Sequence, residues 1–262
     1  MVTIVPQGGL GNRIRSIRAA ARVANKLEVK LRIIWINVCS CEFEDIFHDI
    51  RGIKNGFEVE RIKGIRIPDC LGGGNIQFKR IDQSGYDVIL KDPWCNKFMQ
   101  TDIPNHGNIL LISGGEFFCS EENIEFIFTS QICKIANELM DNVKECVGIH
   151  IRQGDNSKAI ENSPIQLFID MMENIVKENA DICFYVSTDD KKILNLLCQQ
   201  FFGKCLFYKE KSWKRYTKAG QISAAVELLC LAKTKIIYGS YWSSFSEEAA
   251  KIGNIKKINL KG

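Results

Sequence analysis

Short apolar runs alternate with helical patterns along most of the chain, and this alternation limits the fold more than any other feature. In the second half, helices are predicted near 164–178, 191–201, 221–232 and 247–252, and strands at 146–151, 182–186, 205–208, 235–238 and 255–260. Strands that alternate with helices pair in parallel and carry helices on both faces of the sheet. The chain therefore belongs to the α/β class.

The first 36 residues read as strand, glycine turn, helix and strand. Residues 2–5 and 31–36 are the apolar runs, and Ile14, Ile17, Ala21 and Ala24 give the segment between them one apolar helical face. The next hundred residues are less regular, with a short helix predicted at 43–50, an extended segment at 57–67, a strand at 109–113 and a helix at 121–142. We place the domain boundary near 145, which gives domains at 1–145 and 146–262.

Composition excludes several classes of protein. The 11 Cys residues are scattered without a CxxC pair and only three His are present, which argues against a zinc site. No apolar run approaches the roughly 18 residues of a membrane span, and basic residues do not interleave with aromatics as in a nucleic-acid groove. We expect a cytoplasmic protein that binds no nucleic acid.

Four polar clusters stand where predicted strands end, at 8–13, 150–155, 187–190 and 239–246. In open α/β sheets ligands bind beyond the carboxyl ends of the strands. The coincidence predicts that these four clusters contribute to one binding site.

The first two clusters favour an anion. Glycines at 8, 9 and 11 let backbone N–H groups approach a ligand before a helix begins, although a tight turn without a ligand explains them equally well. His150 and Arg152 share one face of their strand, and an arginine at such a strand end fits a bidentate phosphate ligand. The alternative is a structural ion pair between Arg152 and Asp155.

The last two clusters have capping alternatives. Asp189 and Asp190 precede a predicted helix, where aspartate is a common cap, and a carboxylate there also suits a guanine edge or ribose hydroxyls. The serine-rich stretch at 239–246 suits a phosphate, or Ser246 with Glu247 or Glu248 caps the last helix.

Taken together, the clusters resemble a known family. The segments GGLGNR (8–13), VGIHIRQGD (147–155), YVSTDD (185–190) and YGSYWSSFSEEAA (238–250) are similar in order and spacing to the motifs of the GDP-fucose-dependent fucosyltransferases. That superfamily joins the α-1,2 and α-1,6 enzymes, the protein O-fucosyltransferases and the nodulation fucosyltransferases. The resemblance implies a GT-B-like fold in which two Rossmann-like domains with mostly parallel sheets face a cleft.

The resemblance also implies an activity: inverting transfer of fucose from GDP-fucose to a glycan hydroxyl, with no cofactor and no obligatory metal. The domain at 146–262 would bind the donor and the domain at 1–145 would lie on the acceptor side. The implied partners are a GDP-sugar and a glycan acceptor, with peripheral association to a membrane left open. Other GDP-sugars on the same scaffold and a non-catalytic GDP-binding protein remain alternatives.

Site residues follow from the same resemblance. Arg152 would bind the β-phosphate and stabilise departing GDP, while His150 would contact the nucleoside portion of the donor. Guanine recognition would fall to Asp189 or Asp190. The pyrophosphate would be held by Ser243, Ser244, Phe245 and Ser246, and the donor would be approached from the first domain by Gly9, Gly11, Asn12 and Arg13.

Two catalytic points stay open. Asp155 and Glu161 are candidates for the base that accepts the proton of the acceptor hydroxyl, although Asp155 alternatively only orients Arg152. Many relatives carry a second arginine where this chain has Gln153, so the charge of the diphosphate site differs here.

Overall fold

The computed structural model describes residues 1–37, 40–63, 81–92, 100–141, 143, 145–154 and 157–262. The chain divides into two compact units, Met1–Thr129 with Tyr216–Gln221, and Ser130–Arg215 with Ile222–Gly262. The division falls after Thr129 rather than near 145, because α3 (Ser130–Met140) belongs to the second unit. Among the described residues, no helix combines the length and the apolar character needed to cross a membrane.

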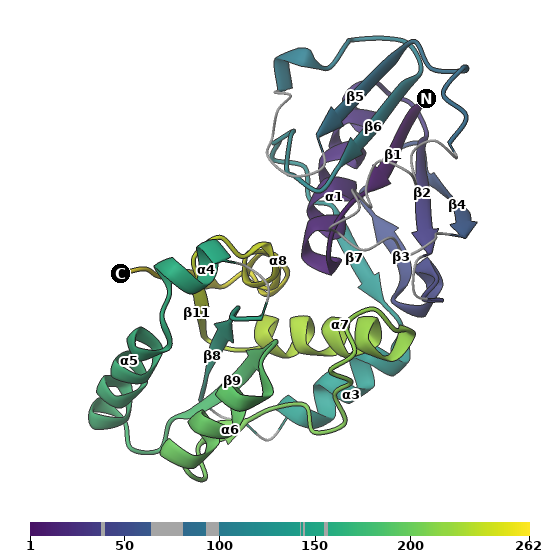
Figure 1. The fold of residues 1–262 in the computed structure, drawn as a ribbon. Helices are drawn as coiled ribbons and strands as arrows, with labels where there is room; N and C mark the ends of the chain where they lie inside the picture. The colour runs from purple at the N-terminus through teal and green to yellow at the C-terminus, as the bar shows by residue number, and fades with distance from the viewer. Residues whose placement is uncertain (38–39, 64–80, 93–99, 142, 144, 155–156) are drawn as a thin grey trace. The chain divides into compact units, whose positions relative to one another are not determined.

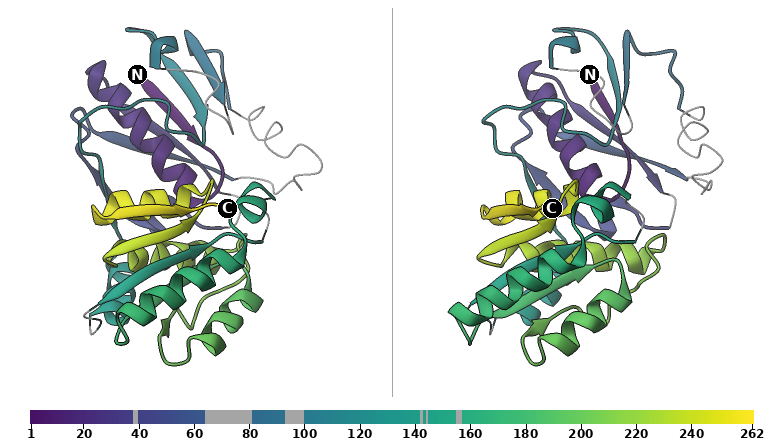
Figure 2. Two further views of the ribbon diagram at one scale, coloured as in Figure 1. Left: turned by 90° about the vertical axis from the view of Figure 1, so that its left-hand side faces the viewer. Right: turned by 60° about the vertical axis from the view of Figure 1, so that its left-hand side comes forward.

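The first unit is built on a five-stranded parallel sheet. Its strands are β1 (Val2–Pro6), β2 (Leu31–Asn37), β4 (Phe57–Lys63), β5 (Val88–Asp92) and β6 (Ile109–Ser113), in the order β4-β2-β1-β6-β5. The helix α1 (Leu10–Lys26) lies along β1 and β2 and buries the predicted face of Ile14, Ile17, Ala21 and Ala24 (Figure 2).

Two predictions for the middle of the chain are wrong. The predicted helix at 43–50 is a 3-10 turn, η1 (Phe43–Asp45), followed by the strand β3 (Phe47–Arg51). The predicted helix at 121–142 holds β7 (Glu125–Phe128) before α3. β3 and β7 pair antiparallel, and Phe47 packs against Phe126 and Phe128, so a contact across about eighty residues overrides the local helical pattern. A second 3-10 turn, η3, spans Gln100–Asp102.

The second unit confirms the predicted alternation. Its helices are α4 (Ser157–Asn162), α5 (Ile165–Glu178), α6 (Lys191–Gln200), α7 (Lys218–Ala232, which begins in the first unit) and α8 (Ser244–Gly253). Its strands are β8 (Cys146–Ile151), β9 (Cys183–Thr188), β10 (Cys205–Leu206), β11 (Ile236–Ser240) and β12 (Lys256–Leu260), all parallel in the order β10-β9-β8-β11-β12. The order reverses direction between β8 and β11 (Figure 1).

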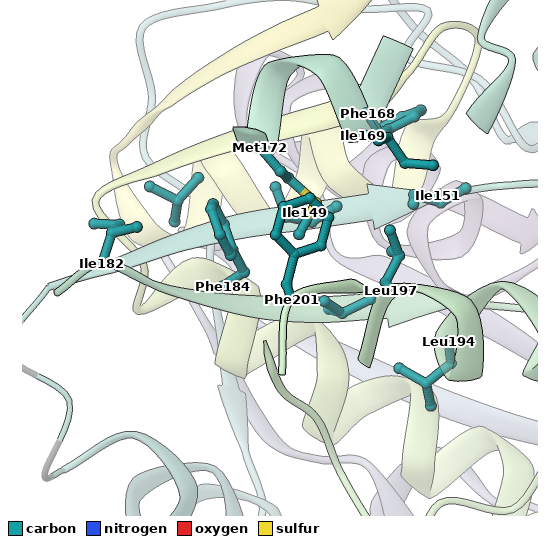
Figure 3. Packing of buried hydrophobic residues seen from close by; sticks show 12 residues of the cluster. Ile149, Ile151, Phe168, Ile169, Met172, Ile182, Phe184, Leu194, Leu197 and Phe201 are labelled. Atoms are coloured by element: carbon teal, nitrogen blue, oxygen red, sulfur yellow. The ribbon is translucent and has the colours of Figure 1, made fainter. Parts of the chain in front are cut away.

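The core of the second unit explains how that sheet is held. Ile149 and Ile151 of β8 and Phe184 of β9 pack against Phe168 of α5 and Leu197 of α6, as Figure 3 shows. The opposite face of the sheet is covered by the end of α7 and the residues that follow it. The packing is tight there, since a Cβ on Gly148 would stand only 2.8 Å from Oγ1 of Thr234, just after α7. Both faces are covered, which makes this a doubly wound, Rossmann-like unit.

Candidate functional site

The carboxyl edge of the second sheet is the candidate site. Ligands of doubly wound sheets bind where the strand order reverses, and here the reversal lies between β8 and β11, with His150 and Gly239 as register partners. Three of the four predicted clusters follow β8, β9 and β11. The sheet therefore brings these three clusters to one edge.

Arg152 is held by Asp189. A guanidinium Nη1 lies 2.9 Å from Asp189 Oδ2, and both side chains are about four-fifths buried, with exposed fractions of 21% and 25%. Asp189 Oδ1 also accepts hydrogen bonds from the backbone N–H groups of Gln153 and Gly154, at 2.9 and 3.0 Å. Asp189 thus orients both the arginine and the loop that carries it. Asp155, the partner considered from the sequence, lies outside the described residues.

Two serines brace the same loop: Ser240, which belongs to the predicted cluster at 239–246, and Ser163, which sequence reasoning missed. The backbone N–H of Arg152 donates to Ser240 Oγ at 3.0 Å. Gln153 Nε2 donates to the carbonyl of Ser163 at 2.8 Å, and Ser163 Oγ accepts the N–H of Tyr241 at 2.8 Å. Gln153 therefore ties the β8 loop to the start of α5.

His150 is a buried, neutral imidazole. Its ring stacks on Phe245 with centroids 5.1 Å apart, and only 5% of the residue is exposed. Burial, and then the nearby charges of Arg152, Lys257 and Lys211, hold the pKa of His150 well below its ordinary value. Its Nδ1 has no hydrogen-bond partner among the described residues. Since buried polar atoms are normally paired, this atom marks a position where a ligand group would be stabilised.

Lys211 and Glu227 form a buried ion pair beside His150. Lys211 Nζ lies 2.8 and 2.9 Å from the Glu227 carboxylate oxygens and donates to the carbonyl of Thr188 at 2.6 Å. Burial raises the pKa of Glu227, against the lowering effect of Lys211. Neither residue was predicted. Both could have been found in the sequence. Lys211 follows β10 on the carboxyl edge, and Glu227 is the one charged residue in the apolar run 222–232.

Lys257 is a third cation at this edge, and it was also missed. Its side chain is 8% exposed, and Nζ lies 3.3 Å from the carbonyl of Ser243 and 3.4 Å from Glu247 Oε1. Burial lowers the pKa of its ammonium group. Arg152, Lys211 and Lys257, each beside a carboxylate, all act electrostatically on His150, and cations gathered in this way suit a diphosphate.

The start of α8 differs in detail from the prediction. Ser243, rather than Ser246, is the N-cap, and no side-chain hydrogen bond completes the cap. Ser246 is fully buried, and its Oγ would stand 2.7 Å from a Cβ placed on Gly239. Ser244 and Phe245 are partly exposed in the first turn. The first N–H groups of a helix lack partners within it, so this end suits an anion.

Asp190 caps α6, as the capping alternative predicted. Its carboxylate accepts the N–H of Lys192 at 2.7 Å. Asp189 therefore orients Arg152 and its loop, while Asp190 caps α6. Guanine recognition by Asp189 or Asp190 stays a prediction.

The first-unit residues are arranged as a tight turn. Gly8 has a φ of 79°, Gly9 precedes α1 as its N-cap, and Gly11 is buried in the first turn. Arg13 Nε donates to the carbonyl of Gly8 at 3.2 Å, and its guanidinium lies 4.5 Å from the centroid of Trp35. These contacts fit the alternative of a structural turn, and donor contacts by Gly9, Gly11, Asn12 and Arg13 stay predictions.

The catalytic base remains a prediction as well. Glu161 is exposed on α4, and Asp155 is outside the described part of the chain. Within that described part, no group of three or more His, Cys, Asp and Glu side chains is placed to hold a metal ion.

Comparison with known proteins gives relatives of the fold. No family model matches the chain and no curated protein matches it. The fucosyltransferase NodZ from Bradyrhizobium has a TM-score of 0.61 at 17% identity, over 94% of this chain and 91% of that one. FUT1 from Arabidopsis thaliana, in complex with GDP, has a TM-score of 0.60 at 14% identity, over 98% and 69% of the two chains. POFUT1 in complex with GDP has a TM-score of 0.58 at 11% identity, over 99% and 97%.

Proposed function

From this fold, which is that of the GT-B-like fucosyltransferases, we propose that the chain is a glycosyltransferase that moves fucose from GDP-fucose to a glycan hydroxyl, with inversion and without an obligatory metal. One observation carries the proposal. At the reversal point of the second sheet, Arg152 is fixed by Asp189 beside a buried, neutral His150 whose Nδ1 has no partner among the described residues. NodZ, which shares the fold, is an α-1,6-fucosyltransferase that was soaked with GDP-fucose.

The geometry supports roles on the donor side. Departure of GDP leaves new negative charge on the β-phosphate, and fixed donors aimed at that charge lower the barrier. The Arg152 fork, pre-oriented by Asp189, is such a donor, and the N-terminal N–H groups of α8 at Ser244 and Phe245 are others. Lys211 and Lys257 add positive charge without needing a metal ion.

His150 has a separate part in this proposal. A neutral imidazole either donates or accepts at Nδ1, so it can hydrogen-bond a hydroxyl or a phosphate oxygen of the donor. Stacking on Phe245 fixes the ring plane. The acceptor hydroxyl attacks the anomeric carbon as the bond to the β-phosphate oxygen breaks, and its proton passes to a base for which Asp155 and Glu161 remain our candidates.

Release of GDP from donor sugars tests the proposal. Full-length chain is incubated with GDP-fucose, GDP-mannose or UDP-galactose and an array of glycan acceptors. We expect release of GDP and transfer of fucose with GDP-fucose. Faster turnover of GDP-mannose would assign another GDP-sugar, and binding of GDP without any turnover would assign a non-catalytic protein.

Metal independence has its own measurement. We expect turnover of GDP-fucose to be unchanged after incubation with EDTA, because Arg152, Lys211 and Lys257 supply the charge that a metal would supply. Loss of turnover that Mn²⁺ restores would contradict this part of the proposal.

We also propose that the protein works in the cytoplasm. The eight cysteines in the described part of the chain are free thiols, which is usual in a reducing compartment. Peripheral association with a membrane stays a prediction, and fractionation of cells that express the chain tests both statements.

A further inference from the structure

Trp242 is an exposed aromatic residue in a strained backbone conformation. Its φ is 62°, in the left-handed region that favours glycine, and 54% of the residue is exposed. A bulky residue in this region is strained and persists only where its surroundings determine it. A side chain kept under such strain without being buried calls for an explanation other than packing.

The surroundings of Trp242 do fix its backbone. On one side, the N–H of Tyr241 donates to Ser163 Oγ at 2.8 Å, and Ser240 Oγ accepts the N–H of Arg152 at 3.0 Å. On the other side, Lys257 Nζ lies 3.3 Å from the carbonyl of Ser243. The indole is thus carried on the short turn between β11 and α8, next to residues that orient Arg152.

Trp242 also has aromatic and cationic neighbours. Its ring centroid lies 5.7 Å from that of Tyr241, with Lys158 Nζ 4.5 Å from the indole centroid and Lys261 Nζ 4.7 Å from the Tyr241 centroid. Each ammonium group covers one face of its ring, and the opposite face of an aromatic ring likewise attracts positively polarised groups. The C–H groups on the apolar face of a pyranose ring are polarised in this way, and the lysines can hydrogen-bond its hydroxyls.

We propose that Trp242 and Tyr241, with Lys158 and Lys261, form a binding platform for a pyranose ring of the acceptor glycan. The role as acceptor platform rests on the proposed function, because a transferase must hold its acceptor beside the donor phosphate site. The platform lies within the second unit and is a site distinct from the donor residues Ser243–Ser246. It selects acceptors by an exposed apolar sugar face.

The test compares Trp242→Ala and Trp242→Gly with Phe202→Ala on a printed array of pyranose oligosaccharides. Phe202 is the matched control because it is 89% exposed and lies just after α6, on the amino side of the sheet. We expect both Trp242 variants to retain glycans about tenfold more weakly than the wild-type chain. Phe202→Ala retains them as the wild-type chain does. Equal retention by Trp242→Ala, or no glycan retained by the wild-type chain, overturns the platform.

Two further readouts separate the platform from the other claims. Trp242→Gly should melt at a higher temperature than Trp242→Ala, since glycine relieves the strain at φ 62°. A lower melting temperature for Trp242→Gly than for Trp242→Ala would show that the backbone at position 242 is not strained. Titration with GDP should give the same affinity for Trp242→Ala and the wild-type chain. If the wild-type chain does not bind GDP but retains glycans through Trp242, the proposed function fails and the platform stands.

Discussion

The carboxyl edges of the two sheets both include a reversal of strand order, and they differ in how their charges are used. In both sheets the order reverses beside the first strand, at β1 and β6 in one and at β8 and β11 in the other. In the first unit, Arg13 and Arg15 donate to the carbonyls of Gly8 and Gly114, and so tie backbone loops to the start of α1. In the second unit, cations converge on His150 and displace its pKa.

This difference makes the second edge the stronger candidate for the donor site. Arginines that satisfy carbonyls stabilise the fold without creating an unusual electrostatic environment. Displaced pKa values and unpaired buried atoms cost stability, and such features cluster at functional sites. Thr3 Oγ1 of the first unit also lacks a partner among the described residues, so the contrast rests on the cations around His150. Glycine content alone left the first turn open between an anion site and a tight turn without a ligand, and its contacts fit the tight turn.

The largest effect is expected at the buried ion pair. Lys211→Met leaves Glu227 buried without its partner, and breaking such a pair lowers the free energy of unfolding by about 3–5 kcal/mol. Urea unfolding measures this loss. The double variant Lys211→Met with Glu227→Gln should recover more than half of it. In the first unit, Lys30→Met breaks the exposed pair with Glu58 and should change stability little. Equal losses of unfolding free energy in Lys211→Met and Lys30→Met would contradict the difference between the two units.

The next effect concerns the two ion-paired arginines. Arg152→Ala should lower turnover of GDP-fucose by about 10²–10³-fold, as the loss of one transition-state donor does. Arg22→Ala removes a similarly buried arginine from the first unit, 3.3 Å from Glu116, and should lower stability with turnover retained. Steady-state rates on both folded variants measure the difference. Near-normal turnover of Arg152→Ala would refute its role.

The smallest effect is a pH dependence of stability. The folded pKa of His150 lies below the ordinary value near 6.5, so below that pH the unfolded chain takes up a proton that the folded chain does not. Stability from this group is present above pH 6.5 and falls, by up to about 1.4 kcal/mol per pH unit, as the pH drops. His150→Gln should remove this part of the slope. His106→Gln, an exposed histidine of the first unit, is the control. An unchanged slope in His150→Gln would contradict burial as the cause.

Local patterns predicted the parallel sheets and brought three of the four predicted clusters to one candidate edge. Each strand of the second unit is short, apolar and followed by polar residues, so its end could be located in the sequence. The strands β3 and β7 could not, because Phe47 finds its partners Phe126 and Phe128 only in the folded chain.

The same limit applies within the site. Arg152 was predicted from its place after β8, but its partner Asp189 follows the neighbouring strand, and Lys257 comes from β12, far away in sequence. Sequence reasoning finds residues that a strand end presents. It does not find the residues that tertiary packing places beside those strand ends.

Calorimetric titration of the full-length chain with GDP, UDP and ADP tests the central claim most directly. We predict that GDP binds most tightly, that Arg152→Ala loses this binding and that Arg22→Ala keeps it. Preference for UDP, or undiminished GDP binding by Arg152→Ala, would contradict the assignment of the second edge as the donor site.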